Sequence, residues 1–396
     1  MRIGIDARMY RTSTAGIGRY SQNLIKNLLK IDHENQYILF MTEEDKKEFT
    51  NSFESDEVKR GFIKPLMTPE DKREFTNSFM TPKIITIDIP HYSIAEQIKL
   101  PGIIKKEKPD IMLFLNFNFP VNYRDKFIVV IHDLTLLFYP ETAHQTNPIK
   151  RLAFDLVIKK ACQNSLRVIA VSNHTKNDII KHFHIDQDKI IVIPEAADDR
   201  TFNYSDSKIA QIKKKYQISF PLILSVGQFR PHKNIPGLLK AFSLLKKDLK
   251  NAKLALIGKP DENYRDFWST LDILGLKKDI LMPGFVSDEE LASWYKIADV
   301  FVFPSFYEGF GLPGLEAMKA GVPVVSSNRT SLPEVYQDAA VYFDPGNYTE
   351  IADKIKLVLR DKKLRETMIA KGKIVASKYS WKKTAEETLG LIKSIK

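Results

Sequence analysis

Two glutamates with seven residues between them, Glu308 and Glu316, lie in the stretch FVFPSFYEGFGLPGLEAMKAGVPVV (301–325). The apolar run that ends at Pro304 predicts a buried parallel strand, and Pro313 suits the first position of a helix. Glu308 is therefore expected on the loop beyond a strand's carboxyl end, with Glu316 early in the following helix. In open α/β sheets, ligands bind in the crevice at that end of the strands.

The pair fits poorly as the acid and nucleophile of a glycosidase. Retaining glycosidases hold their two carboxyl groups about 5 Å apart, whereas eight helical residues rise about 12 Å. Gly309 and Gly311 instead allow the backbone to approach a ligand closely, and the amides of Gly311 and Leu312 begin a helix that favours a phosphate group. Glu308 and Glu316 then serve as acceptors for hydroxyl groups of a sugar or ribose. Alternatively, Glu316 only interacts favourably with the helix dipole.

Cations that suit a diphosphate follow another predicted strand. The run PLILSVG (221–227) is followed by QFRPHKN and by a helix that begins at Ile235. Arg230 can bind phosphate oxygens with two parallel hydrogen bonds, and Lys233 can act as a point charge. His232, between them, is a further candidate.

The chain opens with a strand, a glycine-containing loop and a helix. The strand is expected at 2–7, and Gly16 and Gly18 lie in the loop, followed by Arg19 and Tyr20. Apolar residues then recur at helical spacing: Ile17, Tyr20, Leu24 and Leu28. Because the full GxGxxG pattern is missing, the glycines alone are weak support for a nucleotide site.

The remaining pattern alternates strands and helices. Further strands are expected at 36–40, 84–89, 111–114, 126–134, 167–172, 253–258, 280–285 and 322–325. Further helices are expected at 94–107, 147–165 and 291–298. The strand 126–134 ends with His132 and Asp133, and a histidine there is either a structural group or a functional one. Leu332 and Pro333 are interpreted as a turn.

The run EGFGLPGLEAM, with the GVPVVSSNRTSLPEV that follows it, resembles the E-x7-E signature of the family-4 retaining glycosyltransferases, which have the GT-B fold. The resemblance extends over nearly the whole chain. It implies an α/β protein with two Rossmann-like domains whose parallel sheets face each other across a central cleft. The domains implied are 1–196 on the acceptor side, with the last helix (380–396) packed back on it, and 197–379 for the nucleotide-sugar. The stretch 190–202 resembles the inter-domain link. It contains the run Pro194-Glu-Ala-Ala-Asp198, with Ala196 in place of the usual glycine.

The resemblance also implies roles for individual residues. The implied catalytic residues are His132, Glu308, Arg230 and Lys233. The implied donor-binding residues are Gly16, Gly18, Val286, Gly309, Phe310, Gly311, Leu312 and Glu316. His132 and Glu308 would border the sugar, Glu316 the ribose and Val286 the base. Family members usually carry an arginine directly after the glycine of the second domain's first strand, where this chain has Gln228, so Arg230 takes that role from two residues further on.

The implied reaction is retaining transfer of a hexose from a nucleotide-sugar to a glycan or lipid-linked saccharide, without a metal or another cofactor. Resemblance to bacterial mannosyltransferases of surface-polysaccharide and lipopolysaccharide synthesis favours GDP-mannose as the donor. A UDP-sugar donor, either UDP-glucose or UDP-N-acetylglucosamine, and a GT-B sugar-nucleotide epimerase are the alternatives. Retention without an evident nucleophile implies front-face attack, in which the leaving phosphate accepts the acceptor's proton.

Composition narrows the class of protein. The chain has 396 residues, enough for two domains, and its single cysteine, Cys162, excludes a disulfide framework. The start MRIGIDAR has no apolar segment typical of a signal peptide, and no apolar run reaches the roughly 18 residues of a membrane-spanning helix. We therefore expect a cytoplasmic protein, or one on the cytoplasmic face of a membrane. An amphipathic helix at 147–165 leaves peripheral contact with that membrane open.

The positive charge is concentrated in one part of the chain. The net charge is +11, and Ser205–Ala255 holds 11 basic residues against two acidic ones. Such a surface attracts a diphosphate, anionic lipid or nucleic acid. Nucleic acid is the weakest of these because no zinc-finger spacing or RNA-binding aromatic motif accompanies the charge. A duplicated segment, 41–53 and 67–79, is identical at eleven of thirteen positions and predicts a surface insertion without chemistry of its own.

Overall fold

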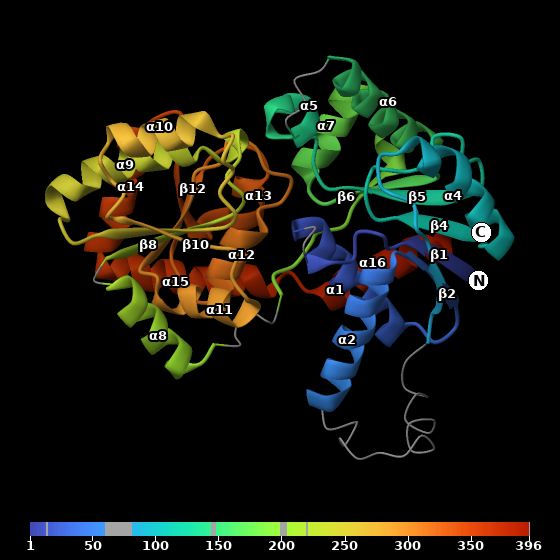
Figure 1. Ribbon diagram of the computed structural model, residues 1–396, viewed down its shortest axis with the longest axis horizontal. Coiled ribbons are helices and arrows are strands. Elements are labelled where there is room, and N and C mark those ends of the chain that lie inside the picture. Colours follow the sequence, from blue (N-terminus) through green and yellow to red (C-terminus); the bar gives the residue numbers. More distant parts are fainter. Residues whose placement is uncertain (13–14, 60–80, 144–147, 199–203, 219–220, 396) are drawn as a thin grey trace.

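The structure is a computed structural model that describes residues 1–12, 15–59, 81–143, 148–198, 204–218 and 221–395. It contains two parallel sheets that lie side by side, each covered by helices (Figure 1). The first sheet contains β1 (Arg2–Asp6), β2 (Gln36–Met41), β3 (Lys83–Thr86), β4 (Ile111–Phe114), β5 (Phe127–Ile131), β6 (Arg167–Ala170) and β7 (Ile190–Val192). The second contains β8 (Leu222–Val226), β9 (Lys253–Ile257), β10 (Ile280–Gly284), β11 (Val300–Phe303), β12 (Val324–Ser327) and β13 (Ala340–Phe343).

The helices of the first half are α1 (Ala15–Ile31), α2 (Glu43–Lys59), α4 (Ile94–Glu107), α5 (Thr135–Phe138), α6 (Pro148–Asn164) and α7 (Asn173–Phe183). Those that follow are α8 (Asp206–Tyr216), α9 (Ile235–Asp248), α10 (Arg265–Ile273), α11 (Asp288–Ile297), α12 (Leu312–Lys319), α13 (Leu332–Tyr336), α14 (Tyr348–Arg360), α15 (Lys362–Ser377) and α16 (Trp381–Ser394). Strands such as β5 are buried along their whole length, as expected of parallel strands with helices on both faces. The predicted α/β class with two parallel sheets is confirmed.

Each sheet has one place where the strand order reverses. The first sheet has the order β3-β2-β1-β4-β5-β6-β7, and the second has the order β10-β9-β8-β11-β12-β13. In the first sheet, β2 and β3 lie on one side of β1, and β4 and the later strands lie on its other side. In the second sheet, β9 and β10 lie on one side of β8, and β11 and the later strands lie on its other side. These two switch points open crevices at the carboxyl ends of the strands, where α/β proteins bind ligands.

The last helix returns to the first half of the chain. Helix α16 lies beside α1, and the Trp381 and Tyr20 rings meet edge to face with centroids 5.6 Å apart (Figure 1). Thr384 Oγ1 donates a hydrogen bond of 2.7 Å to the carbonyl of Pro194. The end of α16 is held by an ion pair of 2.7 Å between Lys393 and Glu34. These contacts join the C-terminal helix to the first sheet's side of the molecule.

Some predicted boundaries were wrong. Helix α11 begins at Asp288 instead of 291, because the Ser287 side chain accepts from the Glu290 amide and acidic residues in the first turn favour a helix start. The turn predicted at Leu332 and Pro333 is the start of the short helix α13. Strand β12 begins at Val324, two residues later than predicted, because the Val322 amide still bonds to the Ala317 carbonyl of the preceding helix.

The duplicated segment is described only in part. Its first copy, 41–53, forms the end of β2 and the beginning of α2. The second copy, 67–79, lies outside the described residues, as does the part of the predicted link beyond residue 198. Within the described part of the link, Ala196 is buried at 1% exposure.

Candidate active site

The loops after β8 and β11 meet at the switch point of the second sheet. The Phe306 amide donates to the His232 carbonyl over 2.7 Å, which ties the two loops together. Lys233 Nζ lies 2.6 Å from Glu308 Oε1, and the two side chains are 18% and 12% exposed. Two residues that are 75 positions apart in the sequence, both predicted for the site, are thus brought together in a partly buried ion pair.

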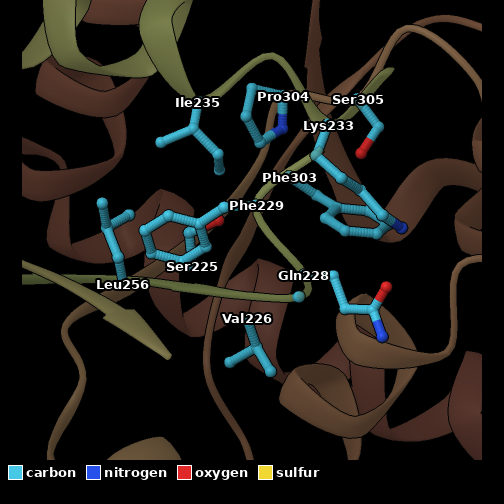
Figure 2. A pocket seen from close by; sticks show the side chains of 11 residues that line it. Ser225, Val226, Gln228, Phe229, Lys233, Ile235, Leu256, Phe303, Pro304 and Ser305 are labelled. Carbon is cyan, nitrogen blue, oxygen red and sulfur yellow. The ribbon is translucent and has the colours of Figure 1, made fainter. Parts of the chain in front are cut away.

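The aromatic ring of Phe303 lies next to the Lys233 side chain. The ammonium lies 5.4 Å from the centre of the Phe303 ring, close enough for a cation–π interaction. Figure 2 shows the lysine side chain alongside that ring, in the wall of a cavity of about 10 Å³ that Ser305 and Gln228 also line. The ammonium of Lys233 therefore contacts both the Phe303 ring and the Glu308 carboxylate on the loop that precedes α12.

The beginning of α12 is shaped for an anion. Gly311 is the N-cap residue with φ of +99°, a left-handed conformation that favours glycine, and Pro313 lies in the first turn as predicted. The Tyr336 hydroxyl donates to the Gly311 carbonyl over 2.5 Å, and a Cβ at Gly311 would lie 2.5 Å from the same hydroxyl oxygen. Because glycine has no capping side chain, the first amides of α12 can bind phosphate oxygens.

Glu316 is held by two partners inside the molecule. The carboxyl is 3% exposed, and Oε1 accepts from Arg19 Nη1 over 2.9 Å while Oε2 accepts from the Tyr295 hydroxyl over 2.9 Å. Burial raises the pKa of Glu316, and the nearby Arg19 charge and the Tyr295 hydrogen bond reduce that rise. Arg19 also reaches Asp288 over 3.2 Å. Glu316 therefore links the second half to helix α1 of the first half.

Arg230 points to a different partner from Lys233. Its Nη1 lies 2.8 Å from Asp261 Oδ2, beyond the carboxyl end of β9, and its side chain is 28% exposed. Lys233 and Arg230 therefore lie on one loop but pair with carboxylates of different loops. His232, between them, is buried, and burial together with the neighbouring Lys233 and Arg230 charges lowers the pKa of its imidazole to about 2.

His132 is engaged through both ring nitrogens. Nδ1 lies 2.7 Å from Glu195 Oε1, and Nε2 lies 2.9 Å from the Leu115 carbonyl oxygen. Burial lowers the pKa of His132, but the Glu195 hydrogen bond and charge outweigh it, so that the pKa lies above its ordinary value. The Tyr20 ring packs edge-on against the imidazole, with centroids 4.7 Å apart. Sequence reasoning did not identify Glu195 as this partner, although it placed the residue in the link.

The two halves touch at Gly309. Its carbonyl accepts from Ser172 Oγ over 2.7 Å, and a Cβ at this position would lie only 1.9 Å from the His132 carbonyl oxygen. Phe310 is 5% exposed and packs edge-on against Tyr379, so only its backbone remains for a ligand. A residue without a Cβ is therefore needed at position 309, because the loop passes against the backbone just beyond the end of β5.

The remaining predicted residues lie around these loops. The prediction that Gly16 and Gly18 lie in a loop was wrong, because the apolar period that includes Ile17 already belongs to helix α1. Gly16 is exposed at the start of α1, and Gly18 is buried in its first turn. Val286 is half-buried after β10, whereas Phe285 beside it exposes 75% of its side chain.

Neither a metal cluster nor a membrane span is found in the described ranges. There, no group of three or more His, Cys, Asp or Glu side chains could hold a metal ion. No helix in the part of the chain that the structure describes is long and apolar enough to cross a membrane. The expectation of a metal-free reaction stays a prediction.

Comparisons with known proteins show the family of this chain. A family model described as glycosyl transferases group 1 matches residues 208–375, and one described as glycosyltransferase family 4 matches residues 14–200. The O-antigen chain mannosyltransferase B of Escherichia coli is 32% identical over 280 residues, which cover 70% of this chain and 72% of that protein. The serotype-specific mannosyltransferase WbdA of Escherichia coli is 32% identical over 224 residues, but the match covers only 27% of its length.

Solved structures show the same fold. HepE of Anabaena, solved in complex with UDP and glucose, aligns over 100% of both chains with a TM-score of 0.73 and 16% identity. WaaG, a glycosyltransferase involved in lipopolysaccharide biosynthesis, aligns over 99% of both chains with a TM-score of 0.70 and 14% identity. The predicted GT-B fold is confirmed, and these findings give no support to an epimerase. The chain belongs to the group 1 glycosyltransferases and is a glycosyltransferase enzyme.

Proposed function

We propose that the protein is a retaining mannosyltransferase that moves mannose from GDP-mannose to a glycan or lipid-linked saccharide, without a metal. The observation that carries the proposal is the Lys233–Glu308 pair, 2.6 Å across, on the loop that leads into the amide end of α12. The choice of mannose is supported by the relatives, since the O-antigen enzyme and WbdA are both named mannosyltransferases.

Stabilisation of the leaving group is the main catalytic effect in this proposal. Departure of the nucleoside diphosphate places negative charge on its terminal phosphate. Once the donor is bound, Lys233, Arg230 and the amides at Gly311 and Leu312 face its phosphates, so little reorganisation is needed to meet that charge. Donor binding draws Lys233 toward the phosphate and leaves the Glu308 carboxylate to accept a hydroxyl of the sugar.

The nucleoside is expected along the rest of the same crevice. Glu316, oriented by Arg19 and Tyr295, accepts the ribose hydroxyls. A carboxylate offers about four lone-pair sites, so two existing hydrogen bonds leave room for ribose. The exposed Phe285 ring and the Val286 backbone border the base.

The transfer itself proceeds on one face of the sugar. The bond from the anomeric carbon to the phosphate oxygen breaks, and the acceptor oxygen attacks from the side that the phosphate leaves. The departing phosphate oxygen takes the proton of the acceptor hydroxyl, so that charge and protons balance. His132 contributes a fixed positive charge near the sugar, because both of its nitrogens are already bound.

A UDP-sugar donor is the second candidate. HepE, which shares the fold over its whole length, is solved with UDP and glucose. We place the enzyme on the cytoplasmic face of a membrane, where the exposed Leu152 and Leu156 of α6 favour peripheral contact with lipid. Nucleic acid has no part in the proposal.

The experiment that tests the proposal compares nucleotides first and products second. GDP is expected to raise the melting temperature more than UDP, because a ligand that binds only the folded state stabilises it. GDP-mannose with a mannoside acceptor should then give an α-linked product by NMR, at the same rate with and without EDTA. A larger shift with UDP supports the second candidate. Release of free mannose or an epimerised nucleotide, without transfer to any acceptor, would overturn the proposal.

The proposed role of Lys233 at the diphosphate can be tested by substitution. Lys233→Ala should lower kcat by roughly 10²–10³, the usual cost of removing one prearranged group that stabilises transition-state charge. Lys259→Ala is the matched control, since Lys259 is exposed at the carboxyl end of the neighbouring strand β9. Equal turnover in the two variants would remove Lys233 from the diphosphate site.

A further inference from the structure

The switch point of the first sheet carries a polar crevice that the donor site does not use. The carboxyl ends of β1 and β4 are neighbours there, and a cavity of about 10 Å³ lies between them. Its polar lining residues are Asp6, His91, Asn116 and Asn118. Leu115 also lines it, and the Leu115 carbonyl accepts from His132, so this crevice adjoins the reaction site.

These polar side chains are held in place by a buried network. Arg8 binds Asp6 over 2.7 Å and Glu96 over 2.5 Å, and its side chain is fully buried. Asn118 Nδ2 donates to Glu96 over 2.8 Å and lies 3.3 Å from His91 Nδ1. A prearranged set of amide, imidazole and carboxylate groups of this kind suits the hydroxyls of a saccharide.

A much larger cavity has one lining residue in common with this crevice. It has a volume of about 650 Å³ and shares Asn118 with the crevice. The walls are mainly apolar and come from α4, α5 and α6, from the residues before α4 and from the segment between β4 and β5: Tyr92, Ile94, Val121, Leu136, Phe154 and Val157. This volume lies in the range of about 300–1,000 Å³ that small-molecule sites occupy.

Exposed apolar side chains also lie on α4 and α6, two of the helices that line this cavity. Ile94 and Ile98 of α4 are 79% and 72% exposed, and Leu152 and Leu156 of α6 are 62% and 48% exposed. Single exposed apolar residues are ordinary, but a gathering of them beside an apolar hollow indicates an interaction site.

We propose that this cavity holds the hydrocarbon chain of a lipid-linked acceptor, while the acceptor's saccharide lies along the crevice toward His132. The proposal rests on the proposed function and names its acceptor's chemistry. The order of the surfaces, polar next to the reaction site and apolar beyond Asn118, matches the order of groups in a glycolipid. A peptide is a poorer occupant, because its backbone N–H and C=O groups would find few partners on these walls.

The experiment measures how chain length affects the acceptor. Methyl, octyl and dodecyl α-mannosides are compared below the micelle-forming concentration with GDP-mannose as donor. In the wild type, KM should fall at least tenfold from the methyl to the dodecyl compound, because each added methylene leaves water for the cavity. Ala153→Trp narrows the cavity from the exposed side of α6 and should remove most of that fall while KM for methyl mannoside stays the same.

Ala370→Trp is the matched control, because Ala370 is an exposed alanine of helix α15. It should behave as the wild type with all three compounds. Equal KM values for methyl and dodecyl mannosides in the wild type, or an equal response of both Trp variants, would overturn the inference. It is also overturned if Ala153→Trp changes only flotation with phosphatidylglycerol vesicles, since the surface is then a membrane contact.

A binding measurement separates this inference from the proposed function. Fluorescence anisotropy of a dansyl-labelled dodecyl α-mannoside needs no transfer and can be recorded with excess GDP. If wild type and Ala370→Trp bind it and Ala153→Trp binds at least tenfold more weakly, the cavity inference stands even where GDP-mannose gives no product. If product forms but the three proteins bind the probe equally, the function stands and the inference fails.

Discussion

His132 lies between two hydrogen-bond acceptors, the Glu195 carboxylate at 2.7 Å and the Leu115 carbonyl at 2.9 Å. A neutral imidazole can donate from only one nitrogen, so the neutral ring would set a lone pair against one of these oxygens. The arrangement therefore favours the imidazolium, with Asp133 as a further nearby negative charge. We therefore propose that this histidine holds positive charge near the sugar.

Glu195→Gln tests this role at the scale of one residue. The amide oxygen can still accept from Nδ1, but the negative charge is gone, so the pKa of His132 should fall toward its ordinary value. The basic limb of the kcat/KM–pH profile should then move to lower pH in the variant. Because the folded-state pKa is raised, the pair stabilises the fold at low pH, and that contribution is lost as pH rises through the raised pKa. The melting temperature of the wild type should exceed that of the variant at pH 6 and converge with it above that pKa.

Asp155→Asn provides the matched control, since Asp155 forms an exposed pair with His182 over 2.9 Å. Its profile should follow the wild type. An unchanged basic limb in Glu195→Gln would show that the charge of His132 does not matter for the reaction.

Candidate site residues could be recognised in the sequence where their spacing to neighbouring residues suggests a chemistry. Glu308, Lys233 and Gly311 were identified from neighbours in the sequence, and the first two form one ion pair. Arg19 and Glu195 were not assigned their partners, because Arg19 pairs with Glu316 across 297 positions and Glu195 with His132 across 63. Such pairs arise from the packing of two halves and leave no local pattern.

At the scale of elements, the loop from β11 to α12 is the part most constrained by its surroundings. Gly309 passes against backbone of the first half, whereas Gly311 shapes the helix start. One short loop thus carries the carboxylate, the helix terminus and the contact between the halves. A change in any of these should affect the others.

Gly309→Ala tests this coupling. A Cβ there would lie 1.9 Å from the His132 carbonyl oxygen, and a backbone atom cannot move aside as a flexible side chain can. We expect a loss of about 1–3 kcal/mol in unfolding free energy, typical of overpacking, together with at least a tenfold lower kcat/KM. Gly346→Ala, where the nearest atom would be 3.6 Å away, should change neither quantity by much. Wild-type activity and stability in both variants would contradict the close approach seen here.

The elements were largely predictable because parallel strands are short buried runs and helices keep an apolar period. The predicted 94–107 and 111–114 agree with α4 and β4. Errors occurred where caps decide the boundary, as at Ser287 before α11. Strand order was not predictable from the residues alone, because which strands become neighbours depends on how the helices pack on both faces.

At the scale of the whole molecule, Arg19 joins the halves at the proposed ribose site. It reaches Glu316 from the first half and also contacts Asp288. Further hydrogen bonds cross between the halves, from Asn173 to Glu334 over 2.8 Å and from Tyr307 to Asp178 over 2.6 Å. If Glu316 binds the ribose as proposed, the contact between the halves and nucleotide binding share this carboxylate.

Arg19→Met should make nucleotide binding depend more strongly on pH. Burial raises the pKa of Glu316 and the Arg19 charge lowers it, so removing the charge raises the pKa further and protonates the carboxyl as pH falls. The ratio of GDP Kd at pH 6 to that at pH 8, measured by calorimetry, should grow by up to about tenfold per unit of added pKa. Arg11→Met is the control, because it removes a cation that is paired with Glu44 and Asp45, and it should keep the wild-type ratio. A wild-type ratio in Arg19→Met as well would show that Glu316 has no part in nucleotide binding.

The return of α16 to α1 has a consequence for biosynthesis. Helix α1 ends at Ile31 and α16 begins at Trp381, so a ribosome makes the whole second half between these two packing partners. Until α16 emerges, the apolar side chains it covers on α1 remain open to water. A nascent chain of this enzyme therefore passes through a long stage in which its first half is incomplete and prone to self-association, and chaperone binding during translation should be strongest in that interval.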